Sequence, residues 1–302
     1  MTHFPHFRTR LAPSPTGSLH LGHVLHLLYV QGIAQELGAS IALRLEDHDQ
    51  GRCRPEFEAS ILRDLEWLGI QIPEHPWRQS ARHNVYQNQL ENLMKRGLVY
   101  ACRCSRRDIQ TMTGMSSGEL KYPGTCRHKN YPLNDPGTSI RLKIDELPID
   151  GETSSVRGPK FRDLLLDEET YSGESPESGD VVIRDRNGYW TYQFTVVIDD
   201  LEQGINLIIR GRDLLSSTAR QLAMRKIFSP DANTPLFAHH PLLVDNDGEK
   251  LAKRKSSEAV SNLRSLGFTA DQVRGLAAFN GGLVTAQRSI SFGEKLNLGL
   301  NI

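Results

Sequence analysis

The stretch Arg10-Leu-Ala-Pro-Ser-Pro-Thr-Gly-Ser-Leu-His20-Leu-Gly-His23 joins an expected β-strand to an expected α-helix. Residues 7–12 are typical of a strand, which the following prolines end. A helix is predicted over 21–37 because its apolar residues keep largely to one face. Helix N-terminal amides and imidazoles can donate hydrogen bonds to phosphate oxygens, and Gly22 lets a ligand approach the backbone. The stretch therefore predicts a phosphate-binding site where the strand meets the helix, although His20 and His23 taken alone would be ordinary surface residues.

The residues that follow alternate between strand and helix patterns. Residues 41–45 (Ile-Ala-Leu-Arg-Leu) alternate as a strand does, and the acidic run Glu46-Asp-His-Asp49 comes directly after them. Amphipathic helices are predicted over 57–68 and 80–96. Because strands that alternate with helices pair in parallel, the fold class is α/β, with a Rossmann-like, doubly wound parallel sheet.

The pattern changes after Gly97, where short strands dominate. A polar, glycine-containing loop is expected up to about residue 137, and Asn187-Gly188 is a strong hairpin signal. The predicted strands lie at 98–104, 139–144, 181–185 and 189–199, and strand–helix alternation resumes with 206–210 and 213–228. We therefore expect a β-rich insertion inside a Rossmann-like domain, then a short helical and finally loose C-terminal segment. The expected parts are 1–97 and 191–245 (catalytic domain), 98–190 (inserted subdomain) and 246–302 (lysine-containing loop and helical tail).

Composition fits an ordinary globular protein. The 302 residues include 36 Lys+Arg and 36 Asp+Glu, and 38% are hydrophobic. No apolar run is long enough to span a bilayer and the first residues lack a signal-peptide core, so we expect a cytoplasmic protein, and a monomer. Basic residues gather in 100–130 and around Lys250, whereas 163–180 hold acids and no Lys or Arg. A polyanion such as RNA would prefer the two basic regions.

Three of the four cysteines lie close together in the sequence. Cys102, Cys104 and Cys126 can reach one tetrahedral ion, which indicates a zinc site. His128 is a candidate fourth ligand from the residues alone, and unpaired cytosolic thiols are the alternative. Cys53 has no cysteine neighbour and is expected to be a free thiol.

A second basic motif, Lys250-Leu-Ala-Lys-Arg254, follows the turn Asn246-Asp-Gly248. Lys250 and Lys253 project from one side and can neutralise charge that builds up on a pyrophosphate leaving group. In isolation the motif would be a solvated basic loop.

Together the two motifs resemble the HIGH and KMSKS signatures of class I aminoacyl-tRNA synthetases. The stretches Arg10–Pro15, Leu43–Asp47, Tyr192–Asp200 and Ile209–Asp213 narrow the resemblance to the glutamyl branch. The resemblance runs from about residue 8 to residue 256. The lysine motif carries Ala252 where the family usually has serine, so one hydroxyl group is missing while Lys250 and Lys253 remain.

Within that branch, full-length synthetases continue past the lysine motif into an anticodon-binding region of on the order of 100 residues, a domain's worth. Here 49 residues follow Lys253. The chain is therefore similar to the shortened glutamyl-Q tRNA(Asp) synthetase family. That resemblance implies activation of L-glutamate without tRNA and transfer to queuosine at the wobble position of tRNA(Asp). The alternatives are a compact synthetase that charges a tRNA 3′ end and a non-catalytic, zinc-stabilised RNA-binding paralogue.

The resemblance also implies roles for single residues. Catalysis is assigned to His20, His23, Lys250 and Lys253, and ATP binding to His20, Gly22, His23 and Lys253, with Mg²⁺ expected alongside ATP. Glutamate contacts are assigned to Arg10, Leu11, Ala12, Pro13, Ser14, Glu46, Tyr192 and Arg210. The guanidiniums of Arg10 and Arg210 can each form two parallel hydrogen bonds with a carboxylate of glutamate, and the Glu46 carboxylate can pair with its ammonium group. The resemblance identifies Tyr122 as the fourth ligand of one structural zinc ion with Cys102, Cys104 and Cys126, and leaves His128 as the competitor.

Overall fold

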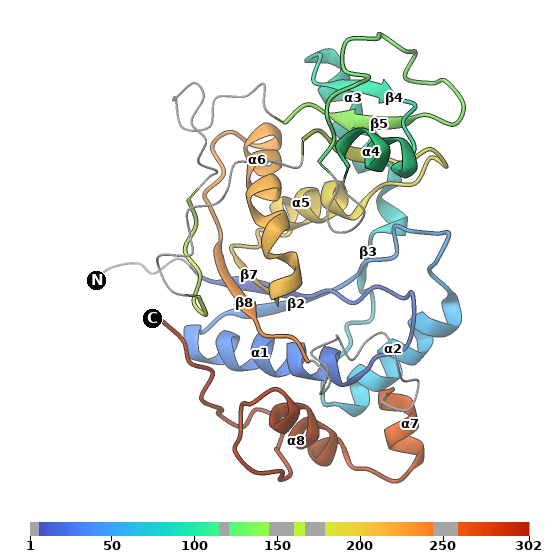
Figure 1. The fold of residues 1–302 in the computed structure, drawn as a ribbon. Helices are drawn as coiled ribbons and strands as arrows, with labels where there is room; N and C mark the ends of the chain where they lie inside the picture. Colours follow the sequence, from blue (N-terminus) through green and yellow to red (C-terminus); the bar gives the residue numbers. More distant parts are fainter. Residues whose placement is uncertain (1–5, 115–120, 145–159, 167–178, 244–258, 302) are drawn as a thin grey trace.

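A computed structural model describes residues 6–114, 121–144, 160–166, 179–243 and 259–301 of the chain (Figure 1). Its centre is a set of parallel strands. Strand β1 (Arg8–Leu11) pairs in parallel with β2 (Ser40–Leu45), which pairs with β3 (Trp77–Arg78), and β7 (Leu207–Gly211) pairs in parallel with β8 (Leu236–His240). The Asn206 amide donates to the Arg8 carbonyl (3.1 Å), which places the start of β7 beside β1. The predicted α/β class is confirmed.

Helices cover both faces of these strands (Figure 1). Helix α1 (Leu21–Leu37) has the predicted bounds and ends at Gly38, whose positive φ of 62° suits a residue without Cβ. In Figure 1, α1 and α8 (Ala270–Asn280) lie on one side of the parallel strands, and α5 (Tyr192–Glu202) and α6 (Thr218–Phe228) on the other. The chain also forms α2 (Pro55–Trp67), α3 (His83–Lys95) after the 3₁₀ turn η1 (Ser80–Arg82), and the 3₁₀ turn η3 (Arg212–Ser217) before α6.

A second sheet is antiparallel and occupies the insertion. Strands β4 (Val99–Cys102), β5 (Ser139–Leu142) and β6 (Val181–Arg184) form it in that order. The expected loop to residue 137 is wrong in one part, because α4 (Arg106–Thr113) lies within it. The sequence holds the signals for this helix: Ser105 and Asp108 form a reciprocal capping box, and Gly114 ends the helix with a positive φ.

The strand predicted over 189–199 is also wrong. The Asn187-Gly188 turn exists, with Gly188 at φ 85°, but only Trp190 bridges back to Arg184. The chain then forms α5 (Tyr192–Glu202). Residues 194–200 are all buried in this helix, polar and apolar alike, so the sequence shows no amphipathic helical period there.

Two large buried clusters form most of the core, and two smaller ones accompany them. One joins the parallel strands to α1, α2, α7 (Val260–Ser265) and α8 (Ala270–Asn280), and the other joins the antiparallel sheet to α3, α5 and α6. The segment 281–301 has no helix or strand, yet it is not loose: Ile290 and Leu298 are buried, and the Asn301 amide donates to the Leu164 carbonyl (2.8 Å). Among the described residues, no helix is long and apolar enough to cross a membrane. The division into parts at residues 97, 190 and 245 stays a prediction.

Candidate active site

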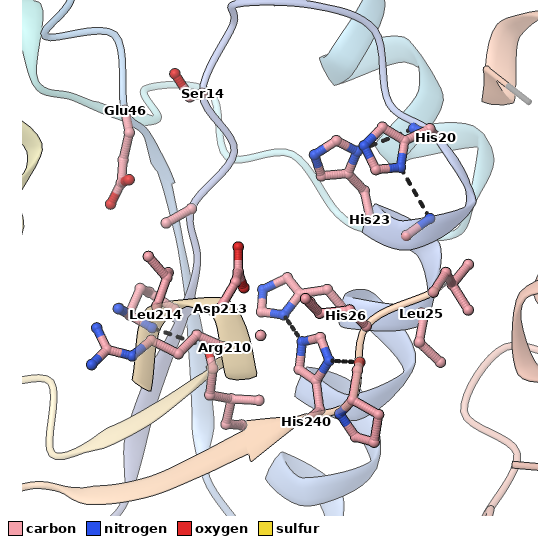
Figure 2. Close-up of a pocket in the computed structure, with 18 of the residues that line it drawn as sticks. Ser14, His20, His23, Leu25, His26, Glu46, Arg210, Asp213, Leu214 and His240 are labelled. Atoms are coloured by element: carbon pink, nitrogen blue, oxygen red, sulfur yellow. Dashed lines mark hydrogen bonds between the residues drawn. The ribbon is translucent and has the colours of Figure 1, made fainter. Parts of the chain in front are cut away.

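A pocket of ≈ 480 Å³ opens where β1 and β7 end and α1 begins (Figure 2). This is the edge at which α/β sheets bind ligands. Its lining gathers most of the described residues that the sequence assigned to glutamate and ATP, together with residues the sequence did not single out. The predicted residues in the lining are Arg10, Ala12, Ser14, His20, Gly22, His23, Glu46, Tyr192 and Arg210.

Two histidines cap the N-terminus of α1. The Gly22 amide donates to His20 Nδ1 (3.1 Å), and the His20 amide donates to His23 Nδ1 (3.1 Å). Burial lowers the pKa of His20, and burial together with the His20 charge lowers the pKa of His23 to about 3. Both rings are therefore neutral near pH 7, and because each Nδ1 accepts a hydrogen bond, the proton of each ring sits on Nε2. The site thus offers two Nε2–H donors of the kind that phosphate oxygens accept.

Gly22 is needed for the same N-terminal cap of α1. A Cβ at this position would lie 2.9 Å from His20 Cε1, closer than carbon atoms tolerate without a shift. The sequence predicted that Gly22 lets a ligand approach the backbone; the structure adds that it leaves room for the His20 ring.

Arg10 and Glu46 lie on the opposite side of the pocket and share one ion-pair network. The Asp200 carboxylate pairs with Arg10 Nε (3.0 Å) and with Arg44 Nη1 (2.8 Å). Arg44 Nη2 pairs in turn with the Glu46 carboxylate (2.9 Å). All four side chains are buried. Two guanidiniums against two carboxylates leave the network formally neutral, which offsets the cost of burying each charge. Sequence reasoning missed Arg44 and Asp200, which hold the predicted pair in place.

Arg210 is held by three inward contacts. Its Nε donates to His239 Nε2 (3.0 Å), Nη1 to Gln221 Oε1 (2.5 Å) and Nη2 to Thr218 Oγ1 (2.7 Å). Burial lowers the pKa of Arg210 and raises that of Tyr192, with which it interacts. An arginine pKa lies so far above neutrality that the guanidinium keeps its charge. A fixed, buried cation facing a pocket is a receptor for a carboxylate.

His26 and His240 form a further pair in the pocket lining that sequence reasoning missed (Figure 2). His240 Nδ1 donates to the Pro241 carbonyl (2.8 Å), and His26 Nδ1 lies 3.0 Å from His240 Nε2. Burial lowers the pKa of both rings, so both are neutral. The three-residue spacing of His20, His23 and His26 was the available signal for His26, because it places all three on neighbouring turns of one helix.

Two residues assigned to glutamate do not line the pocket. Leu11 packs in the core, and the Pro13 carbonyl accepts the Glu46 amide (2.9 Å). Lys250 and Lys253, with Ala252 between them, lie outside the described residues. Their roles, like those of the other assigned residues, stay predictions.

The three predicted cysteines lie together in the inserted subdomain. The sulfurs of Cys102, Cys104 and Cys126 are all within 4.8 Å of one another. The Tyr122 hydroxyl lies 3.3 Å from Cys102 Sγ and 3.8 Å from Cys104 Sγ. Burial raises the pKa of Cys126, but hydrogen bonds led by that from Tyr122 outweigh it and bring the pKa to about 7. Three soft thiol ligands at this spacing, with an oxygen beside them, fit one tetrahedral Zn²⁺. The side chain of His128, the competing ligand, is exposed.

Comparisons with known proteins agree with this geometry. Residues 6–281 match the family model for class I tRNA synthetases (E and Q), catalytic domain. A glutamyl-Q tRNA(Asp) synthetase of Rhodobacter capsulatus is 36% identical over 89% of this chain and 98% of its own length. One of Nitratidesulfovibrio vulgaris is 37% identical over 92% of this chain and 87% of its own. A glutamate–tRNA ligase of Desulfosudis oleivorans is 34% identical, but the match covers only 54% of that protein.

Solved structures show the same fold. A glutamate tRNA ligase from Elizabethkingia meningosepticum superposes with a TM-score of 0.67 at 24% identity. A glutamate-tRNA synthetase from Elizabethkingia anophelis gives 0.63 at 27% identity. The chain covers 60% and 54% of those two chains, respectively.

Proposed function

Because the chain belongs to the class I tRNA synthetases for glutamate and glutamine, and is thus a ligase, we propose that it activates L-glutamate with ATP in the absence of RNA. One observation carries this proposal. Two buried guanidiniums, Arg10 and Arg210, line the same pocket as the two imidazoles that cap α1. Carboxylate receptors and phosphate donors in one pocket are what glutamate adenylation requires.

In this reaction the α-carboxylate oxygen of glutamate attacks the α-phosphorus of ATP and pyrophosphate leaves, which gives glutamyl-adenylate. No side chain has to move a proton, so catalysis rests on positioning and charge stabilisation. Arg10, Arg210 and Tyr192 hold glutamate, Glu46 faces the ammonium, and the Nε2–H groups of the capping histidines hold the triphosphate. Lys253, with Lys250, neutralises the pyrophosphate as it departs.

Metals have separate roles in this proposal. Cys102, Cys104, Cys126 and Tyr122 would hold one zinc ion, which supplies a structural cross-link between the segments that carry them. With four protein ligands the ion has no open position for catalysis. Mg²⁺ enters with ATP, bound to its phosphates.

We propose queuosine in tRNA(Asp) as the acceptor. Support comes from relatives named for that activity, which this chain matches along nearly their whole length, whereas it matches about half of a glutamate–tRNA ligase.

Arg106 and Arg107 are exposed on α4 and are candidate contacts for the anticodon arm. Their charge reversal should weaken transfer to tRNA and leave adenylation unchanged; unchanged transfer would remove them from the RNA-binding surface. A cytoplasmic location and a monomeric state are also part of the proposal.

The first experiment is glutamate-dependent ATP–pyrophosphate exchange without RNA. Exchange supports RNA-independent activation. Exchange that needs added tRNA would indicate an ordinary glutamyl-tRNA synthetase. No exchange with or without tRNA would indicate a non-catalytic paralogue. Glutamine and aspartate in place of glutamate are the specificity controls.

The second experiment identifies the acceptor. Labelled glutamate is offered to tRNA(Asp) with and without queuosine, and to tRNA(Glu). The proposal expects label only on the queuosine-containing tRNA(Asp). Labelling that does not depend on queuosine would overturn the proposed acceptor and leave the adenylation intact.

A further inference from the structure

Behind Arg210, away from the pocket, lies a pair of fully buried side chains. Asp163 Oδ2 is 2.5 Å from His239 Nδ1, and both side chains have no exposed surface. His239 Nε2 in turn accepts the Nε–H of Arg210 (3.0 Å). Asp163, His239 and Arg210 thus form a continuous chain of hydrogen bonds that ends at the pocket.

Only one tautomer of His239 satisfies these contacts. A carboxylate accepts hydrogen bonds, so Nδ1 must carry the proton that Asp163 receives. Arg210 Nε–H and the Thr218 hydroxyl (3.1 Å) both face Nε2, and a guanidinium can only donate, so Nε2 must present a lone pair. Burial, the largest influence, lowers the pKa of His239, which agrees with a neutral ring. The carboxylate that selects the tautomer therefore also selects the direction in which Arg210 Nε points.

Asp163 is itself held from several sides. The His239 amide lies 3.2 Å from both of its oxygens, and the Leu165 amide donates to Oδ1 (2.9 Å). Leu164 pairs with the Phe237 carbonyl on β8 (2.8 Å). These contacts hold the carboxylate in the orientation that faces His239 Nδ1.

The chain of contacts determines what Arg210 can offer a ligand. A guanidinium has five N–H bonds. His239, Gln221 and Thr218 take three, which leaves two on the terminal nitrogens, where the Tyr192 hydroxyl also hydrogen-bonds with the guanidinium. These N–H groups, together with the Tyr192 hydroxyl, are what this end of the pocket can offer to the two oxygens of a carboxylate.

We propose that Asp163 and His239 are positioning residues that fix the Arg210 guanidinium for a carboxylate of glutamate. They touch no substrate themselves. The inference rests on the proposed function, since it assigns a specificity role within the same site. It predicts that their loss weakens the enzyme's use of glutamate and leaves its use of ATP unchanged, because the capping histidines that face the phosphates do not contact them.

The test compares four variants in the exchange assay, with the KM of glutamate and of ATP measured separately. His239→Leu removes the acceptor for Arg210 and should raise the glutamate KM roughly 10- to 100-fold, the effect of losing a hydrogen bond to a charged group. His239→Gln can place an amide oxygen near the Nε2 position and should recover part of that loss. Asp163→Asn can donate to Nδ1, which favours the wrong tautomer, and should also raise the glutamate KM.

Asp64→Asn is the matched control. Asp64 is equally buried, and it pairs with Arg264 (3.0 Å) away from the pocket. Its replacement should leave both KM values unchanged.

The outcomes separate the two proposals. If the wild-type protein shows no glutamate-dependent exchange, the proposed function fails before any variant is compared. If the wild type exchanges but the variants shift both KM values alike, or neither, the pair is merely structural and the inference is overturned. Should His239→Leu not fold, the comparison between His239→Gln and Asp163→Asn decides: a larger glutamate KM in the latter supports tautomer control, and equal values contradict it.

Discussion

Mild acid should destabilise the ligand-free protein, and His23 alone should account for a measurable share. Its pKa is lowered from 6.5 to about 3 in the folded chain by burial and by His20. Between those two values the unfolded chain binds the proton and the folded chain does not, so the free energy of unfolding falls as the pH falls. From about pH 7.5 to about pH 5.5, the unfolded imidazole goes from mostly neutral to mostly charged, which would amount to about 1.4 kcal/mol for a fully enclosed ring. The His23 side chain is partly open to solvent, and screening by water should reduce its share to about 0.5–1 kcal/mol.

Four other imidazoles have pKa values lowered in the same direction, so the loss in the wild type should exceed the His23 share; they belong to His20, His26, His239 and His240. Urea titrations of ligand-free protein at the two pH values measure it. His23→Asn isolates one imidazole, because the asparagine oxygen can still accept the His20 amide but does not titrate in this range.

The variant should lose about 0.5–1 kcal/mol less than the wild type over the same pH interval. Any effect of acid on the cysteine cluster cancels in this difference. His75→Asn is the control, since the His75 side chain is 91% exposed and its replacement should leave the pH dependence unchanged. A pH dependence for His23→Asn equal to that of the wild type would refute the assignment of a neutral imidazole with a lowered pKa at the cap of α1.

Three further outcomes are expected. Lys253→Ala should slow ATP–pyrophosphate exchange about 10²–10³-fold, because one preorganised charge on the leaving group is lost; unchanged exchange would remove that role. Tyr122→Phe should lower zinc affinity, measured by competition with a chelator, whereas His128→Ala should not; the reverse result would make His128 the fourth ligand. Gly275→Ala should cost about 1–3 kcal/mol in urea titrations, because the added Cβ would overlap the carbonyl oxygen of Arg288, and an unchanged midpoint would contradict this packing.

Much of the fold was predictable because its signals are local. Helix α1 is rich in apolar residues, which are buried on all its sides rather than on the one face expected, and it ends at a glycine; its predicted bounds hold. Helix α5 shows the limit: residues rich in β-branched side chains favour a strand, but burial on all sides of the element overrides that preference. Helix α4 was missed although Ser105 and Gly114 carried its boundary signals, because a polar stretch without an apolar period resembles a loop.

The site was predictable where residue identity carried chemistry. Arg10, Arg210, Glu46 and the capping histidines line one pocket as the motifs implied. The supporting residues were not predictable, because their meaning arises only from contacts across the fold. Asp163 belongs to an acidic stretch in the sequence, and nothing there indicates that it meets His239, 76 residues away.

The contacts between β1 and the segment around β7 have a consequence for how the chain is made. Arg8 and Arg10 emerge early from the ribosome, but their partners Asn206, Asp200 and Ile209 lie 190 or more residues later. At about 5–20 residues per second, translation delivers those partners only after roughly 10–40 s. Until then the nascent chain exposes one edge of its first strand, and the guanidinium of Arg10 lacks its carboxylate partner. During this time a chaperone could bind the exposed strand.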